Sequence, residues 1–157
     1  MPTMIKKMLA PLLLLVMFGC SSDSSTNDPI DFTEANEQEI QAFIAAQELN
    51  AQRSSTGLYY VINDPGFGDR PTSGSNVTVA YRGYFTNGDV FDESGPEGIS
   101  FNLNQVIPGW TEGITYFGEG GSGMLLVPSR LGYGNTGRGS IPGGAVLVFD
   151  VNVLSIN

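Results

Sequence analysis

From Gly57 to its end, the chain consists of short apolar segments separated by turns rich in glycine, aspartate and proline. Apolar and polar residues alternate in several segments, such as 77–84 and 145–154, and this period of two indicates half-buried β-strands. One short helix is expected among them, over about 108–116, because Pro108 suits a first helical position. The sequence therefore predicts an α+β fold in which a curved antiparallel sheet of five or six strands, a half-barrel, wraps around one short helix.

The predicted strands lie at residues 58–62, 77–84, 90–92, 99–103, 124–127 and 145–154. Asn87-Gly88 is a strong signal for a tight turn between the second and third strands, because both residues tolerate the positive φ angles of hairpin turns. Loops are expected at 63–75 and 128–144, where glycine and proline are frequent.

The predicted short helix carries the only tryptophan of the chain, Trp110, which shares a face with Ile114. The backbone N–H groups at a helix start have no intrahelical partner, so the N–H of Ile107 is free to bond a group outside the chain. Two interpretations remain open from periodicity alone. Trp110 is either an ordinary core residue or the floor of a pocket.

The ionisable residues exclude several classes of function. Seven basic and 16 acidic residues give a formal charge of −9, which argues against nucleic-acid binding because phosphates require Lys and Arg. The chain has no histidine and one cysteine, so it can form neither a Ser-His-Asp triad nor a His/Cys zinc site. Asp89, Asp92 and Glu93 lie close together but are typical of turn polarity. We predict no metal and no cofactor.

Residues 1–19 are predicted to be a signal peptide, with Lys6-Lys7 before an apolar run that is too short to span a bilayer stably. Gly19-Cys20 followed by serines resembles a bacterial lipoprotein signal, in which the cysteine is lipidated. The alternative is an ordinary secretory signal with a chance cysteine. The resemblance implies a membrane anchor on Cys20, carrying palmitate, and a location in the cell envelope, with the outer membrane favoured.

Residues 20–32 are rich in Ser, Asp, Asn and Thr and are predicted to form a flexible tether. The N-terminal segment 33–56 follows, and a helix is expected over about 33–51. Ile40, Phe43, Ile44 and Gln47 lie at helical spacing and form a narrow stripe. Such a stripe is typical either of docking onto the rest of the protein or of a weak self-contact.

Several motifs occur in order over about 100 residues. They are Val79-Ala80-Tyr81-Arg82-Gly83-Tyr84, Gly88-Asp89-Val90-Phe91-Asp92-Glu93-Ser94, Val106-Ile107-Pro108-Gly109-Trp110, Leu126-Val127-Pro128, Gly132-Tyr133-Gly134, Ile141-Pro142 and Leu147-Val148-Phe149-Asp150-Val151. Through them, residues 57–157 resemble the FKBP-type peptidyl-prolyl cis-trans isomerase domain. The helix near 33–51 is similar to an N-terminal segment of bacterial members, which in some relatives helps to form a homodimer.

The resemblance implies a pocket for proline-containing polypeptides. Its walls and floor would be Tyr81, Phe91, Val106, Ile107, Trp110, Tyr133 and Phe149, with Asp92 at the polar edge and Ile99, Leu131 and Ile141 at the rim. The Ile107 N–H and the Tyr133 hydroxyl would bond carbonyls of the bound peptide.

Three functions follow from this comparison. The first is an isomerase that assists the folding of exported proteins. The second is a catalytically weak chaperone or peptide-binding module, favoured by Ile99 and Leu131, which stand where many family members have aromatic residues. The third is a structural envelope lipoprotein with a vestigial pocket, against which the retained pocket residues argue.

Overall fold

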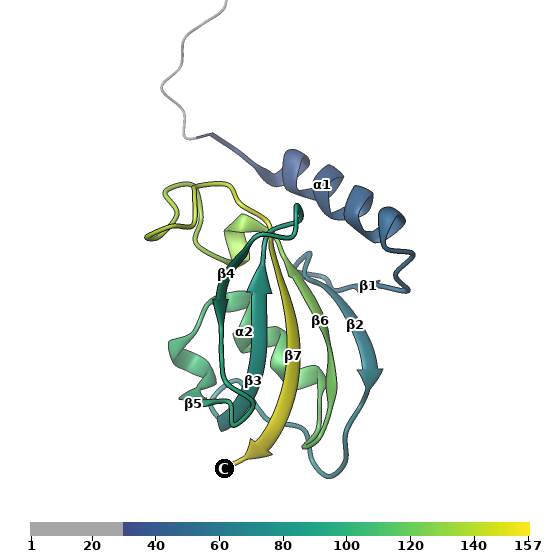
Figure 1. The fold of residues 1–157 in the computed structure, drawn as a ribbon, viewed down its shortest axis with the longest axis vertical. Coiled ribbons are helices and arrows are strands. Elements are labelled where there is room, and N and C mark those ends of the chain that lie inside the picture. Colours follow the sequence, from purple (N-terminus) through teal and green to yellow (C-terminus); the bar gives the residue numbers. More distant parts are fainter. Residues whose placement is uncertain (1–29) are drawn as a thin grey trace, which may run out of the picture.

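The computed structural model describes residues 30–157, which form an antiparallel sheet with a helix on each face (Figure 1). The helices are α1 Thr33–Ala46 and α2 Pro108–Gly113, and a turn of 3₁₀ helix, Ile114–Tyr116, continues α2. The strands are β1 Gln52–Arg53, β2 Tyr59–Asp64, β3 Asn76–Tyr84, β4 Val90–Glu93, β5 Ile99–Asn102, β6 Ser122–Val127 and β7 Leu147–Ile156. The predicted α+β class is confirmed.

The sheet has seven strands, and six of them follow the order β1-β2-β6-β7-β3-β4. The seventh, β5, also pairs with β3, at residues 76–79, whereas β4 pairs at residues 82–84. β7 lies at the centre and pairs with both β6 and β3 along most of its length. The predicted turn at Asn87-Gly88 joins β3 to β4, with Gly88 at a φ of 93°. The strand count exceeds the expected five or six because the two-residue β1 adds an edge to β2.

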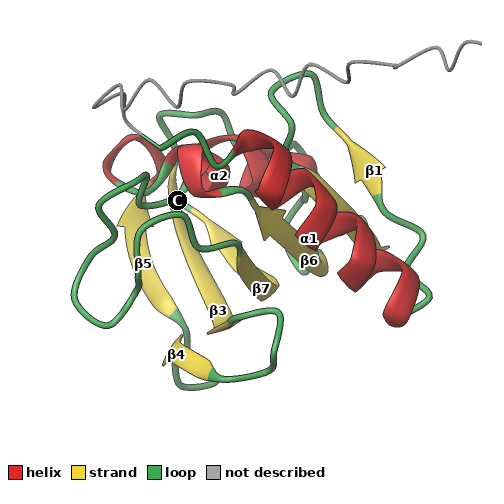
Figure 2. Cartoon of the chain, turned by 90° about the horizontal axis from the view of Figure 1, so that it is seen from above, coloured by secondary structure: helices red, strands yellow, loops and turns green. Residues whose placement is uncertain are grey.

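Alternation along β6 and β7 sends their side chains into two separate cores. Leu125 and Phe149 point to the face covered by α2, where the larger core lies. Leu126 and Val148 point to the opposite face, which α1 covers at one end (Figure 2). The sheet is therefore buried on both faces near this end, and α1 belongs to the same packed unit as the strands.

The apolar stripe of α1 docks onto the sheet of its own chain. Ile40 is only 1% exposed and contacts the core that contains Leu126 and Val148, with Phe43 and Ile44 packed beside it. Of the two uses that the sequence left open for this stripe, the structure shows docking.

The helix ends earlier than the expected residue 51, because the chain leaves it through a Schellman turn. Glu48 adopts a φ of 52°, and the Leu49 N–H donates to the Ile44 carbonyl at 3.0 Å. Glycine usually occupies such a position, so a glutamate there left no sign in the sequence. The turn frees residues 52–53 to form β1.

The predicted signal peptide 1–19, the lipidation site Cys20 and most of the predicted tether lie outside the described residues. Within residues 30–157, neither α1 nor α2 has the length and apolarity that crossing a bilayer requires.

Replacing Ile40 by alanine should lower the free energy of unfolding by about 2–5 kcal/mol, because the substitution leaves a cavity between α1 and the sheet. Urea unfolding followed by circular dichroism measures this loss. Gln38→Ala is the matched control, since Gln38 is exposed on the same helix, and it should change stability by less than about 0.5 kcal/mol. Equal effects of the two substitutions would show that α1 does not dock in solution.

Candidate functional site: an aromatic pocket over α2

The floor of the site is the first turn of α2, which begins at Pro108. Two glycines on this helix allow it to lie close to β6. A Cβ atom on Gly109 would come within 2.6 Å of Val127, and one on Gly113 within 2.7 Å of Leu125. Trp110, between them, is 5% exposed. The sequence Pro-Gly-Trp therefore starts the helix, seats it on the sheet and places the indole at the base of the pocket.

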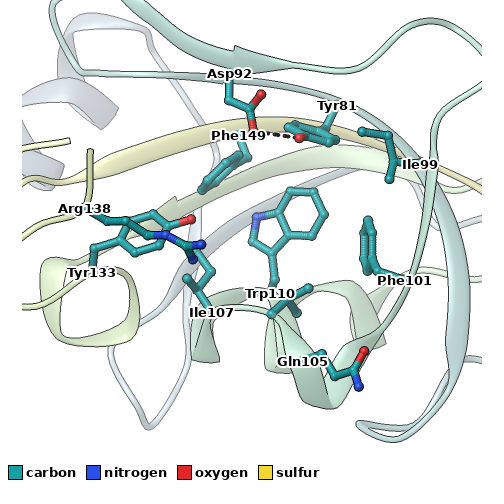
Figure 3. Close-up of a pocket in the computed structure, with 11 residues that line it drawn as sticks. Tyr81, Asp92, Ile99, Phe101, Gln105, Ile107, Trp110, Tyr133, Arg138 and Phe149 are labelled. Carbon is teal, nitrogen blue, oxygen red and sulfur yellow. Dashed lines mark hydrogen bonds between the residues drawn. The ribbon is translucent and has the colours of Figure 1, made fainter. Parts of the chain in front are cut away.

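A cavity of about 450 Å³ opens above this floor (Figure 3). Its lining comes from β3, β4, β5, the start of α2, the loop between β6 and β7, and β7 itself. The lining residues are Tyr81, Asp92, Ile99, Phe101, Gln105, Val106, Ile107, Trp110, Tyr133, Arg138 and Phe149. The volume suits a few residues of a peptide or a small ligand.

Aromatic rings pack around Trp110 mostly edge to face. The indole lies 5.0 Å from the ring of Tyr81 and 5.2 Å from that of Phe149, at interplanar angles of 88° and 82°. Phe101 lies 5.2 Å away at 56°. Edge-to-face packing is the favoured geometry for such rings and holds each in one orientation. The walls around Trp110 are thus aromatic and packed against one another.

One hydrogen bond marks the polar edge of the pocket. The Tyr81 hydroxyl donates to the Asp92 carboxylate at 2.7 Å (Figure 3). Burial and this bond to Asp92 raise the pKa of the Tyr81 phenol above its ordinary value. The phenol therefore stays neutral, and a donor, through the physiological range.

Comparison with known proteins identifies the family. Residues 68–154 match the FKBP-type peptidyl-prolyl cis-trans isomerase family. The chain belongs to this family.

Among curated relatives, the isomerase FkpA of Aeromonas hydrophila is 41% identical over 125 residues, which cover 77% of this chain and 47% of the relative. FkpA of Escherichia coli K12 is 42% identical over 113 residues, 71% of this chain and 42% of the relative. The chain thus spans about half the length of the curated relatives it matches.

Solved structures of peptidyl-prolyl isomerases resemble this chain in both sequence and fold. The crystal structure of Escherichia coli FkpA is 40% identical with a TM-score of 0.72, covering 79% of this chain and 59% of that one. A peptidyl-prolyl isomerase structure from Pseudomonas syringae is 29% identical with a TM-score of 0.68, covering 84% and 98%.

Most of the site residues predicted for this FKBP domain lie together. The cavity lining includes Tyr81, Asp92, Val106, Ile107, Trp110, Tyr133 and Phe149, and Ile99 at the rim.

Three predicted residues do not line the cavity. The ring of Phe91 lies 5.5 Å from that of Phe149, edge to face. Leu131 and Ile141 pack against the larger core instead. All three are half-buried and pack against the core that contains Trp110 and Phe149.

Phe101 is an aromatic wall that the sequence interpretation missed. It lies two residues after Ile99 on the same face of β5 and packs against Trp110. It supplies an aromatic surface near the place where Ile99 provides none. The alternation Ile99-Ser100-Phe101 was the available signal, because residues two apart on a strand share a face.

Arg138 adds a positive charge to a rim that sequence reasoning treated as apolar. Its guanidinium carbon lies 5.9 Å from the centre of the Tyr133 ring. Paired backbone hydrogen bonds between Arg138 and Ile141 hold it at a tight loop tip. Figure 3 shows Arg138 and Tyr133 on one side of Trp110, with Ile99 and Phe101 on the other. Gln105 is the third lining residue that was missed.

Substituting Gly83 by alanine should displace the aromatic wall. A Cβ atom there would lie 2.7 Å from the Phe91 ring and 2.9 Å from that of Phe149. Overpacking of this kind costs about 1–3 kcal/mol, measurable by chemical denaturation. Trp110 fluorescence should change as well, because Phe149 packs on the indole.

Gly74→Ala provides the control, since a Cβ atom on Gly74 has nothing within 4 Å. If both substitutions leave stability and fluorescence unchanged, the wall is looser than the structure shows.

Proposed function

We propose that this chain catalyses cis–trans isomerisation of X–Pro bonds in polypeptides. The observation that carries the proposal is the cavity of about 450 Å³, floored by Trp110 and walled by Tyr81, Phe101 and Phe149. Membership of the FKBP family supports the same reaction, because the relatives are named as isomerases.

The reaction suits a site without histidine or cysteine. Rotation about an X–Pro bond is opposed by amide resonance, with a barrier of about 18–20 kcal/mol, and takes roughly tens to hundreds of seconds uncatalysed. No covalent intermediate is required. A twisted amide has less charge separation than a planar one, so an apolar aromatic pocket favours it over the planar form more than water does. The walls around Trp110 would supply this environment.

Two donors would hold the peptide while the amide rotates. The Ile107 carbonyl accepts the N–H groups of Trp110 and Thr111, whereas the Ile107 N–H has no partner within residues 30–157. The Tyr133 hydroxyl lines the same pocket and likewise donates to no group within residues 30–157. Both are available to carbonyl oxygens flanking the proline, and fixing those carbonyls reduces the motion required to reach the transition state.

A second candidate function is peptide binding with negligible turnover, as in a chaperone. Ile99, at the pocket mouth, is 47% exposed, which offers an apolar surface to an unfolded segment. Phe101 favours turnover, because it closes the aromatic wall beside Ile99.

We further propose that the protein assists the folding of exported proteins in the cell envelope, anchored by a lipid on Cys20. The leader pattern before Cys20 supports this. Incorporation of a clickable palmitate analogue in the bacterial host should be lost in Cys20→Ala, and labelling of that variant would rule out this anchor. A homodimer would have to use another face of α1, because Ile40 packs on the sheet of its own chain.

The full chain should accelerate cis–trans exchange of a Leu-Pro peptide in an NMR magnetisation-transfer assay. Tyr133→Phe removes only the hydroxyl and should lower the catalysed rate by about 2- to 12-fold, the effect of one hydrogen bond worth about 0.5–1.5 kcal/mol. Tyr60→Phe is the matched control, because the Tyr60 hydroxyl bonds Gln52 away from the pocket. That variant should retain the full rate.

No acceleration by the native chain would contradict the isomerase. Trp110 is the only tryptophan, so a peptide titration followed by its fluorescence then tests the second candidate. A saturable change without turnover would establish a binding module.

A further inference from the structure

The side chain of Asn36 on α1 is buried against the loop between β6 and β7. It is 2% exposed. Its amide nitrogen donates to the Gly144 carbonyl at 2.7 Å, and its amide oxygen accepts the Ser129 N–H at 2.7 Å. Ser129 lies near the start of this loop and Gly144 near its end, so one side chain joins the two ends of the segment that carries Tyr133.

These contacts belong to a closed ring of four hydrogen bonds. The Ser129 carbonyl accepts the Gly134 N–H at 2.7 Å, and the Gly134 carbonyl accepts the Gly144 N–H at 2.9 Å. Asn36 closes the ring between Gly144 and Ser129. Gly134 follows Tyr133 directly in the chain. The ring therefore fixes the backbone next to the hydroxyl-bearing residue of the pocket.

The ring depends on Asn36 because the other three members contribute only backbone groups. Without its amide, the Ser129 N–H and the Gly144 carbonyl would be left unpaired in a buried position, which is costly. Asn36 and Ser129 are also the two buried polar residues of the described part of the chain. Asparagine suits this position, since it offers a donor and an acceptor in one planar group.

Two neighbouring residues strengthen the connection. The amide of Asn135 donates to the Ile30 carbonyl at 2.5 Å. Gly144 lies against the ring of Phe32, with a φ of 78°, and a side chain there would collide with that ring. The segment from Ile30 to Asn36 thus contacts the pocket loop at both its middle and its end.

We propose that Asn36 is a positioning residue for Tyr133 and that α1 thereby forms part of the isomerase site. The inference rests on the proposed function, because Tyr133 is assigned there as a donor to the peptide. Asn36 does not line the pocket and acts through the loop. Loss of its two bonds would free the loop ends and let the Tyr133 hydroxyl leave its place beside Trp110.

A double-mutant cycle in the full chain tests this, with exchange of the Leu-Pro peptide as the readout. Asn36→Ala should lower the catalysed rate by the same 2- to 12-fold as Tyr133→Phe. The double variant should be as slow as Tyr133→Phe alone, because both changes remove one function. Multiplying effects, or a rate unchanged in Asn36→Ala, would overturn the proposal.

Ile44→Ala is the control, because Ile44 docks α1 to the sheet without joining the ring. Ile44→Ala should either leave the catalysed rate unchanged or lower it by a factor that multiplies with that of Tyr133→Phe. Circular dichroism confirms that each variant is folded at the assay temperature. If Asn36→Ala does not fold, Asn36→Asp replaces it. That variant has the same size and keeps the acceptor for Ser129, while its ionised form offers no donor to Gly144.

A separate readout distinguishes failure of this inference from failure of the proposed function. NMR signals of the Tyr133 ring should shift in Asn36→Ala and stay in place in Ile44→Ala. If the native chain does not accelerate exchange, the proposed function fails. The aromatic NMR signals of Tyr133 still decide whether Asn36 positions that residue. If the NMR signals of the Tyr133 aromatic protons are unchanged in Asn36→Ala, that result alone overturns the inference.

Discussion

The close packing of α2 on β6 is the contact on which the pocket depends. Gly109 and Gly113 carry no side chain, and any Cβ atom there would come within 2.7 Å of Val127 or Leu125. The backbone of the helix therefore lies directly against the side chains of β6. Trp110, between the two glycines, packs against the rings of Tyr81 and Phe149 and lines the cavity. A bulkier residue at either position would push the helix, and the indole with it, away from β6, so the two glycines help to place the pocket floor.

The central strands β6 and β7 contribute side chains to the cores on both faces of the sheet. Phe149 forms a wall of the pocket, while its neighbour Val148 contacts the core beneath α1. Leu125 and Leu126 are divided between the two faces in the same way. Because alternate residues of one strand serve both cores, a shift of β7 would disturb the pocket and the docking of α1 at once. The pocket wall and the surface on which α1 docks therefore share strand β7.

Much of the fold could be predicted because its signals are local. Alternation marked the strands, and Pro108 marked the start of α2. The end of α1 was missed because Glu48 occupies a left-handed turn that normally selects glycine. For the site, Phe101 could have been found from strand alternation. Asn36 could not, because its partners Ser129 and Gly144 lie 93 and 108 residues away. Nothing near Asn36 in the sequence indicates which loop it meets.

Because the reaction is only a rotation about a bond, its rate depends on how accurately the site positions the peptide. With no nucleophile or proton transfer to provide the rate, a site of this kind depends on holding a few donors and apolar walls in register. The apolar walls can hold one another, as the rings around Trp110 do. The Tyr133 ring packs against the larger core, but its hydroxyl extends from a loop, and hydrogen bonds hold the backbone of that loop. The proposed role gives a reason for the buried polar side chain of Asn36 between α1 and this loop, where it pairs the Ser129 N–H and the Gly144 carbonyl.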